Sequence, residues 1–359
     1  MKAPIMLKLA IAATALPLFL LAATRADDAS DRWPVAKAWH WYAQQPWLVG
    51  CNFLPSTAVN DVEMWQAETF DAHSIDRELG WAQGLGFNAV RVFINYVVWK
   101  ADPAGLKRRL DQFLAIADRH GIKTLVILLD DCFKQNPHVG KQDDPIPGVH
   151  NSQWVASPGK RMVQDAGRWG DLEQYVSGII GRFAGDRRVL AWELYNEPTQ
   201  SLPLVEAAFR WARQARPSQP VTATLFGPVE MQRRILDLSD VVSFHQYGPL
   251  PALKATVAKL QEQGRPLLCT EWMARKNGSR FETHLPFFKQ QKIGCWNWGF
   301  VAGRTQTFFP WGSKPGAVEP ALWFHDILHG NGTPYDDRET ATIRLLTGRG
   351  SATTPSPRP

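Results

Sequence analysis

The sequence predicts an α/β fold, a single-domain (β/α)₈ TIM barrel, from three observations. Eight short runs of aliphatic or β-branched residues recur along the 359-residue chain, most of them followed by a helical pattern. Two glutamates stand at the ends of such runs, at the fourth and the seventh. Glycine follows two of the predicted helices directly. Eight parallel strands, each followed by a helix, are the number that closes a barrel.

The eight predicted strands alternate with helices whose apolar residues recur at helical spacing. The strands span residues 47–53, 89–95, 124–130, 189–195, 221–226, 241–245, 266–271 and 294–298. The clearest helices span 75–85, 106–120, 172–183, 204–213 and 251–263. Gly86 and Gly121 stand just past two of these helices, where a left-handed residue would end the helix before the next strand.

Both ends of the chain differ from the barrel in composition. Lys2 and Lys8 precede an apolar run over 9–23, too short to span a membrane, which leads to small residues near Ala26. We predict a signal peptide over 1–26, a catalytic barrel over 27–346 and a disordered tail over 347–359. The mature protein would then be secreted or periplasmic, with no membrane span.

Charge and composition exclude several classes of partner. Removing the predicted leader lowers the net charge from +6 to +3, because the leader carries three basic residues and no acid. This surplus is too small to indicate nucleic-acid binding. The 16 Trp and 18 Phe provide flat rings on which sugars stack, or they fill a bulky core. We expect a monomer whose partner is a carbohydrate substrate.

The four cysteines are too sparse for a disulfide scaffold, and none forms a CxxC pair. Cys51 and Cys295 would lie on the first and last strands, which are neighbours in a closed barrel. They could therefore form a disulfide, or remain buried free thiols. Both alternatives stay open.

Two acids at strand ends are the candidates for chemistry. Glu197 follows the fourth strand in Trp192-Glu193-Leu194-Tyr195-Asn196-Glu197-Pro198, and Glu271 ends the seventh in Cys269-Thr270-Glu271-Trp272. Strands four and seven face each other across an eight-stranded barrel, so both carboxyl groups would converge at its carboxyl-terminal mouth. Such a pair suits cleavage of a glycosidic bond. The alternative is surface charge, which is the usual fate of glutamate.

Four elements at strand ends together resemble the active-site set of clan A glycoside hydrolases, especially cellulase-like family five enzymes. They are Asn196-Glu197-Pro198, His245-Gln246-Tyr247, Glu271 and Trp298, and the resemblance covers roughly residues 40 to 345. It implies that Glu197 is the acid/base and Glu271 the nucleophile.

The same resemblance implies supporting roles. Asn196 would bind the sugar 2-hydroxyl, Tyr247 would hydrogen-bond the nucleophile, and His245 would lie near the acid/base. Trp298 would be the platform beneath the sugar, whereas Trp296 could be a core residue. Arg91 would steady the nucleophile, or form an ion pair inside the barrel with Glu193.

One segment departs from the family pattern. Family five enzymes generally carry a histidine just past strand three, where this chain has Leu129-Asp130-Asp131-Cys132-Phe133. We therefore expect Asp130 to contact the substrate. Further candidates for the rim are Asn52, Gln306, Thr307 and Trp311, while Trp65 and Trp154 are either outer platforms or packing residues.

The predicted reaction is hydrolysis of a β-linked oligo- or polysaccharide with retention of configuration. Burial would raise the pKa of Glu197 so that it enters protonated, while Arg91 and Tyr247 keep Glu271 ionised. No metal or organic cofactor is expected, because the chain has no phosphate loop, dinucleotide motif or two-metal carboxylate cluster.

Two alternatives remain open, a transglycosylase using the same glutamates and a barrel that only binds polysaccharide. A binding module needs no second carboxylate, which argues against the latter. The irregular stretch over 132–167 would lie at the mouth and could close one end of the cleft, favouring short oligosaccharides.

Overall fold

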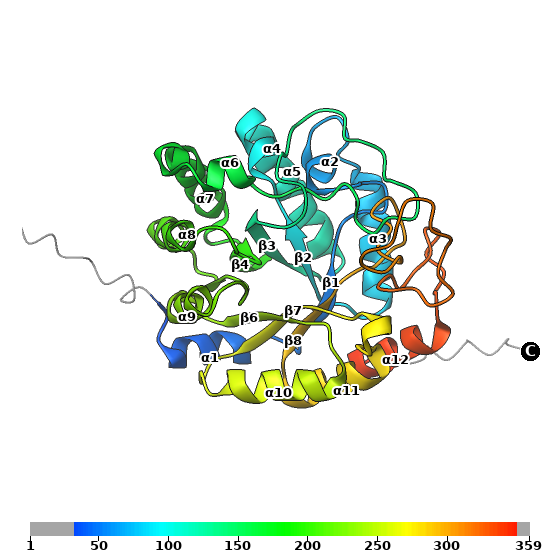
Figure 1. Cartoon of the computed structure of the whole chain (residues 1–359). Helices are drawn as coiled ribbons and strands as arrows, with labels where there is room; N and C mark the ends of the chain where they lie inside the picture. The colour runs from blue at the N-terminus through cyan, green and yellow to red at the C-terminus, as the bar shows by residue number, and fades with distance from the viewer. Residues whose placement is uncertain (1–31, 350–359) are drawn as a thin grey trace, which may run out of the picture.

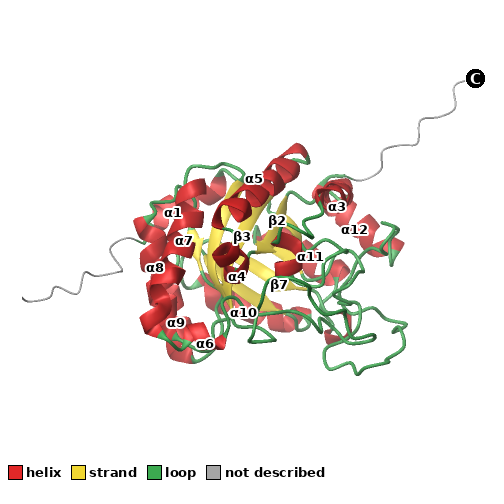
Figure 2. Cartoon of the chain, turned by 90° about the horizontal axis from the view of Figure 1, so that it is seen from above, coloured by secondary structure: helices red, strands yellow, loops and turns green. Residues whose placement is uncertain are grey.

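The computed structural model describes residues 32–349, which form a ring of eight parallel strands surrounded by helices (Figure 1, Figure 2). The strands are β1 Val49–Asn52, β2 Ala89–Phe93, β3 Lys123–Asp130, β4 Val189–Asn196, β5 Val221–Thr222, β6 Val242–Gln246, β7 Leu267–Trp272 and β8 Gly294–Asn297. Their order is β5-β4-β3-β2-β1-β8-β7-β6. A parallel bridge between Thr224 and Ser243 joins β5 to β6. The predicted (β/α)₈ barrel is confirmed.

The α-helices precede, follow or connect the strands. They are α1 Val35–Ala43, α2 Asp61–Trp65, α3 Ala72–Gly84, α4 Tyr96–Ala101, α5 Pro103–Arg119, α6 Lys160–Val163, α7 Trp169–Phe183, α8 Leu202–Gln214, α9 Val229–Leu238, α10 Leu250–Gln261, α11 Phe281–Gln291 and α12 Asp337–Thr347. The five predicted helices correspond to α3, α5, α7, α8 and α10. Gly86 and Gly121 have φ of 80° and 69°, which confirms their expected left-handed conformation at helix ends.

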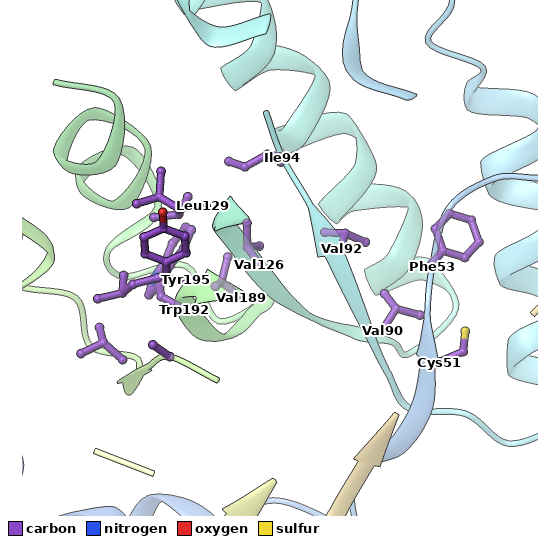
Figure 3. Packing of buried hydrophobic residues seen from close by; sticks show 14 of the residues in the cluster. Cys51, Phe53, Val90, Val92, Ile94, Val126, Leu129, Val189, Trp192 and Tyr195 are labelled. Carbon is purple, nitrogen blue, oxygen red and sulfur yellow. The ribbon is translucent and has the colours of Figure 1, made fainter. Parts of the chain in front are cut away.

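Strand side chains that point outward pack against the helices. Figure 3 shows part of this layer, including Val90 and Val92 of β2 and Cys51 of β1, all buried. Because side chains alternate along a strand, the residues between them, such as Arg91, point into the barrel. The outer layer is mostly apolar, so the helices are held against the strands mainly by burial of hydrophobic surface.

The amino-terminal end of the barrel interior is closed by an apolar layer. Its members are buried side chains from several strands and the segments before them, namely Leu48, Ala89, Leu125, Leu190, Val241, Leu268 and Trp296. Tyr42 of α1 packs against this layer, and its hydroxyl donates to the carbonyl of Lys292 over 2.6 Å. The helix α1 thus covers the end of the barrel opposite the glutamates.

At the carboxyl-terminal end, the segment after β3 and the segment after β8 join to form a wall (Figure 1). The backbone N–H of Asn151 donates to the carbonyl of Thr305 over 2.8 Å, and the backbone N–H of Gly316 donates to the carbonyl of Pro147 over 2.8 Å. Gln306 accepts from the Gly148 amide and donates to the Ile146 carbonyl, both at 2.9 Å. These bonds fix the long irregular stretch predicted over 132–167 against the other side of the mouth.

The predicted ends of the chain lie mostly outside the described residues. The proposed leader, 1–26, and residues 350–359 belong to this group. Thr347, assigned to the disordered tail, is instead the last residue of α12, and its hydroxyl donates to the Leu85 carbonyl over 2.9 Å. The ordered part therefore extends slightly past the predicted boundary. Between residues 32 and 349, no helix is long and apolar enough to cross a membrane.

The four cysteines are free thiols, and Cys51, Cys269 and Cys295 are buried. Cys51 and Cys295 do lie on neighbouring strands, but Cys295 pairs in register with Val49 and Cys51 with Asn297. Of the two alternatives, the structure has the buried thiols.

Candidate active site

The barrel brings both predicted glutamates to one pocket at the carboxyl-terminal mouth. Glu197 directly follows β4 and Glu271 lies in β7. One carboxylate oxygen of each and a ring nitrogen of His245 all lie within 4.8 Å of one another. The pocket, of about 330 Å³, is lined by Cys132, Phe133, His150, Asn151, Trp154, Asn196, Glu197, Phe226, Tyr247, Glu271, Trp298 and Trp311.

Arg91 lies beneath the pocket and connects its polar side chains. Its guanidinium donates to Glu271 Oε1, to Asn196 Oδ1 and to Asn52 Oδ1, each over 2.7 Å. It also forms a two-point ion pair with Glu193, which is wholly buried. The two roles weighed for Arg91, support of the nucleophile and an internal ion pair, are therefore both present at once.

The Arg91 charge is secured by its partners. Burial lowers the pKa of this guanidinium, but the charges and hydrogen bonds of Glu193 and Glu271 raise it by more than burial lowers it. Arg91 therefore stays a cation. Glu193 receives further hydrogen bonds from the hydroxyls of Thr224, at 2.6 Å, and Ser243, at 3.2 Å. Buried charges are tolerated inside a barrel only when ion-pair and hydrogen-bond partners compensate for their lost solvation.

Glu271 is held at both carboxylate oxygens. Arg91 donates to Oε1, and the Tyr247 hydroxyl donates to Oε2 over 2.6 Å. Burial nevertheless raises the pKa of Glu271, since it outweighs the opposing effects of His245, Arg91 and the Tyr247 bond, and the charge of Glu197 adds to it. Arg91 and Tyr247 were expected to dominate the pKa of Glu271, but burial has the larger effect.

Glu197 also has a partner on each oxygen. His245 Nδ1 lies 2.7 Å from Oε1, and the Cys132 thiol donates to Oε2 over 3.3 Å. Burial raises the pKa of Glu197, as expected, but the bond and charge of His245, the thiol and the charge of Arg91 together leave it below the usual value. The predicted net direction of the Glu197 pKa was thus wrong, because the prediction placed His245 nearby but did not include the hydrogen bonds of His245 and Cys132 or the charge of His245.

His245 lies close to both glutamates. Its Nδ1 lies 2.7 Å from Glu197 and 3.5 Å from Glu271. Burial lowers the pKa of His245, but the two carboxylates raise it more, so the net direction is upward. His245 Nδ1 is thus placed to exchange a proton with Glu197, and the two carboxylates favour the protonated form of the ring.

Asn196 is oriented by its neighbours. Its Oδ1 accepts from Arg91, and its Nδ2 donates to Asp130 over 2.9 Å. Asp130 also accepts from the Trp154 indole over 2.8 Å, and it is 1% exposed and does not line the pocket. Burial raises its pKa to about 6. The structure places Asp130 behind Asn196, so its contacts are those of a residue that orients the amide.

The aromatic candidates fall into three groups. Trp298 and Trp311 line the pocket, and Trp298 packs edge-on against Trp154 with ring centroids 5.7 Å apart. Trp296 belongs to the apolar layer at the opposite end, and it is fully buried. Trp65 is also fully buried, packed against Phe113. Packing, not sugar binding, is the role that the contacts of Trp65 and Trp296 indicate.

Three predicted rim residues, Asn52, Gln306 and Thr307, do not line the catalytic pocket. Asn52 lies in the barrel interior, where it accepts from Arg91 and donates to the carbonyl of Thr270 over 2.9 Å. Gln306 fastens the wall described above. Asn52 and Gln306 therefore contact the frame of the catalytic pocket, while Asn52 and Thr307 line a smaller hollow beside it.

Several residues of the pocket were not singled out from the sequence. Cys132, Phe133, His150, Asn151 and Phe226 come from loops, whose conformation gives no periodic signal. Asp131, beside Cys132, accepts from the backbone amides of Thr199 at 2.7 Å and Gln200 at 3.0 Å, and so fixes the chain after Glu197. The unusual Asp-Asp-Cys after strand three was the available signal.

Glu197, His245 and Glu271 are close enough to approach a cation. Arg91 already neutralises Glu271, and His245 Nδ1 is bonded to Glu197. Their donor set fits proton transfer between carboxylates better than metal binding.

Comparisons with known proteins agree with this geometry. Residues 57–302 match the model of the cellulase family, glycosyl hydrolase family 5. No curated protein matches in sequence. Among solved structures, GH5_18 from Streptomyces cattleya in complex with Manβ1-4GlcNAc is 15% identical, with a TM-score of 0.58 over 87% of this chain and 83% of that one.

Two further solved structures share the fold. The exo-β-1,4-mannosidase Op5Man5 from Opitutaceae bacterium strain TAV5 is 17% identical, with a TM-score of 0.58 over 84% of this chain and 60% of that one. The endo-β-1,4-mannanase from Thermotoga petrophila is 15% identical, with a TM-score of 0.55 over 84% and 76%. Since the family model spans more than half of the chain, this protein belongs to glycosyl hydrolase family 5 and is a glycoside hydrolase.

Proposed function

We propose that this glycosidase cleaves a β-linked sugar with retention of configuration, with Glu271 as nucleophile and Glu197 as acid/base. The observation that carries the proposal is the approach of the two carboxylates, with oxygens within 4.8 Å of each other. Retaining enzymes keep their carboxyl groups about 5–5.5 Å apart, whereas inverting enzymes leave room for a water between them. The different partners of the two glutamates support the division of roles.

The reaction has two steps. Glu271 attacks the anomeric carbon while the bond to the leaving oxygen breaks and Glu197 gives that oxygen its proton. Glu197 then takes a proton from water, the water oxygen attacks the anomeric carbon, and Glu271 leaves as a carboxylate. Arg91 and Tyr247 bond both oxygens of Glu271, which favours its ionised form when substrate arrives.

The proton for the first step comes from the pair of Glu197 and His245. The 2.7 Å contact between His245 Nδ1 and Glu197 Oε1 lets a proton move between the ring and the carboxylate. A leaving group that displaces water from the pocket favours the neutral pair, because charged groups lose solvation.

For the sugar, we propose a β-mannoside. The three structures compared above are described as binding Manβ1-4GlcNAc or as acting on β-1,4-mannosides. The wall between the segments after β3 and β8 closes one side of the mouth, which favours short substrates. We also propose that residues 1–26 direct the protein out of the cytoplasm.

The test compares the wild type with Glu271→Gly and Glu197→Ala on aryl β-mannosides, β-glucosides and β-xylosides, with and without azide. We expect wild-type cleavage, loss of activity by about 10³-fold or more in both variants, and rescue of both by azide. Glu271→Gly should give an α-glycosyl azide and Glu197→Ala a β-glycosyl azide. The reverse pairing would overturn the two roles.

Binding of sugar without cleavage of any substrate would overturn the hydrolase proposal. Faster release from glucosides than from mannosides would overturn the substrate class alone. Glu206→Gln is a suitable control, since Glu206 lies on α8 in a surface ion pair with Arg234. This variant should keep wild-type kinetics.

A further inference from the structure

A second, smaller hollow adjoins the catalytic pocket and contains buried polar groups that the mechanism does not use. The two hollows share Asn151, Trp154 and Trp298 in their linings. The smaller one is also lined by Thr305, Thr307 and Asp326, among others, and its volume is about 30 Å³. We call this hollow the side niche.

Asn151 is unusual in both its side chain and its backbone. It is 1% exposed, and neither Oδ1 nor Nδ2 of its side-chain amide has a hydrogen-bond partner among residues 32–349. A buried polar group without a partner costs about 1–3 kcal/mol. Its φ of 50° is in the left-handed region, which asparagine tolerates better than most residues. Such cost and strain at the wall of a pocket indicate a group prepared for a ligand.

Asp326 supplies a second unused group. It is 1% exposed, its Oδ1 accepts from the Thr307 hydroxyl over 2.7 Å, and its Oδ2 has no partner within the described chain. Burial raises the pKa of Asp326 to about 6. An amide that donates and accepts and a carboxyl oxygen that accepts together match a hydroxyl group, which both donates and accepts.

The size of the side niche limits what can enter. A water needs roughly 10–15 Å³ of such volume, so the niche has room for about two groups the size of a hydroxyl. A pyranose ring is far too large. The hydroxymethyl group fits, because it is the arm of a hexopyranose that extends one carbon beyond the ring.

On the basis of the proposed function, we propose that the side niche binds the hydroxymethyl group of the sugar that stacks on Trp298, through Asn151 and Asp326. The niche would then select hexosides over pentosides and over 6-deoxy sugars. Its volume of about 30 Å³ also leaves no room for another sugar unit inside the niche.

The test is a comparison of substrates, because the ratio between two substrates is insensitive to general damage. We would measure kcat/KM for an aryl β-mannoside and for its 6-deoxy analogue. The wild type should prefer the parent by about 10- to 100-fold, since the analogue leaves buried groups unpaired. In Asn151→Gly and Asp326→Asn this preference should fall to about threefold or less.

The variants are chosen to preserve the structure. Glycine adopts the φ of Asn151 without strain, and asparagine at 326 keeps an acceptor for Thr307. Lys292→Gly is the matched control, because Lys292 has φ of 52° and lies at the end of α11, outside the pocket. It should keep the wild-type preference.

A wild-type preference that survives in both niche variants would overturn the proposal, as would equal rates on the two sugars in the wild type. Either result leaves the hydrolase proposal intact, because the parent sugar is still cleaved. If the parent is not cleaved, Kd values for methyl β-mannoside and its 6-deoxy analogue decide. Equal Kd values, or no binding of either sugar, would overturn the niche as well.

Discussion

The two ends of the barrel interior are built from the same strands but from opposite chemistry. At the amino-terminal end, Leu125, Leu268 and Trp296 fill the space with apolar side chains. At the carboxyl-terminal end, Arg91 lies among Glu193 and Glu271, all three nearly or wholly buried. Burial of apolar surface alone stabilises the first arrangement. The second is stable only because each buried charge has an ion-pair or hydrogen-bond partner. The comparison suggests that stability is concentrated at one end and function at the other.

The largest expected effect is at the polar end, with Arg91→Met. This change leaves Glu193 and Glu271 buried without their cation, which costs about 3–5 kcal/mol in the free energy of unfolding. It should also abolish activity, because Glu271 would be harder to ionise. Urea unfolding and kcat/KM measure the two effects. Arg119→Met, in an exposed ion pair with Asp76, is the control and should change little.

A substitution in the apolar layer at the amino-terminal end should affect stability but not catalysis. Leu268→Ala removes a fully buried side chain of β7 and should cost about 2–5 kcal/mol in unfolding free energy. In this variant, kcat should stay near the wild-type value at temperatures where the protein remains folded. If Leu268→Ala lowered kcat as strongly as Arg91→Met, the proposed separation of the two ends would be wrong.

A smaller effect is expected from His245→Asn, which changes a partner of Glu197 and leaves Arg91 in place. Burial raises the pKa of Glu197, and loss of the His245 bond and charge removes the main opposing influence, so this pKa rises. Glu197 must be protonated to act as acid, and activity is lost as pH increases through its pKa. The alkaline limb of the kcat/KM profile should therefore move to higher pH.

The rate at the optimum should fall by about 10²- to 10⁴-fold for a substrate with a poor leaving group, the range that general acid catalysis contributes. A dinitrophenyl glycoside needs little protonation, and its rate should change much less. An alkaline limb that stays in place would show that His245 does not set the protonation of Glu197.

The same contrast explains what the sequence could predict. Strand periodicity alone placed Glu197 and Glu271 at one mouth, because the ends of parallel strands meet at one edge. The role of Arg91 was predicted from the resemblance to family five enzymes, with an ion pair inside the barrel as the alternative. Asn151 and Asp326 could not be predicted, since each lies in a loop whose course depends on bonds to the other wall, such as that from Asn151 to Thr305.

The directions of the pKa shifts were the other part that the sequence could not supply. Burial was expected to raise the pKa of Glu197, and burial does act in that direction. The outcome depends on two side chains brought from β6 and from the segment after β3 to distances of 2.7 and 3.3 Å. Such balances between burial and hydrogen bonding require coordinates.

The smallest expected effect concerns Cys132, which lies between the wall and Glu197. Its thiol donates to Glu197 Oε2, and burial raises its pKa, so that it remains a neutral donor. Thiols are weak donors, and Cys132→Ala should change kcat/KM by less than about tenfold while moving the alkaline limb slightly upward. Cys132→Ser, with a stronger donor, should move the limb downward. If the alkaline limb moves in the same direction in Cys132→Ala and in Cys132→Ser, Cys132 acts through the shape of the pocket. A hydrogen-bonding role predicts opposite movements, because serine can donate to Glu197 and alanine cannot.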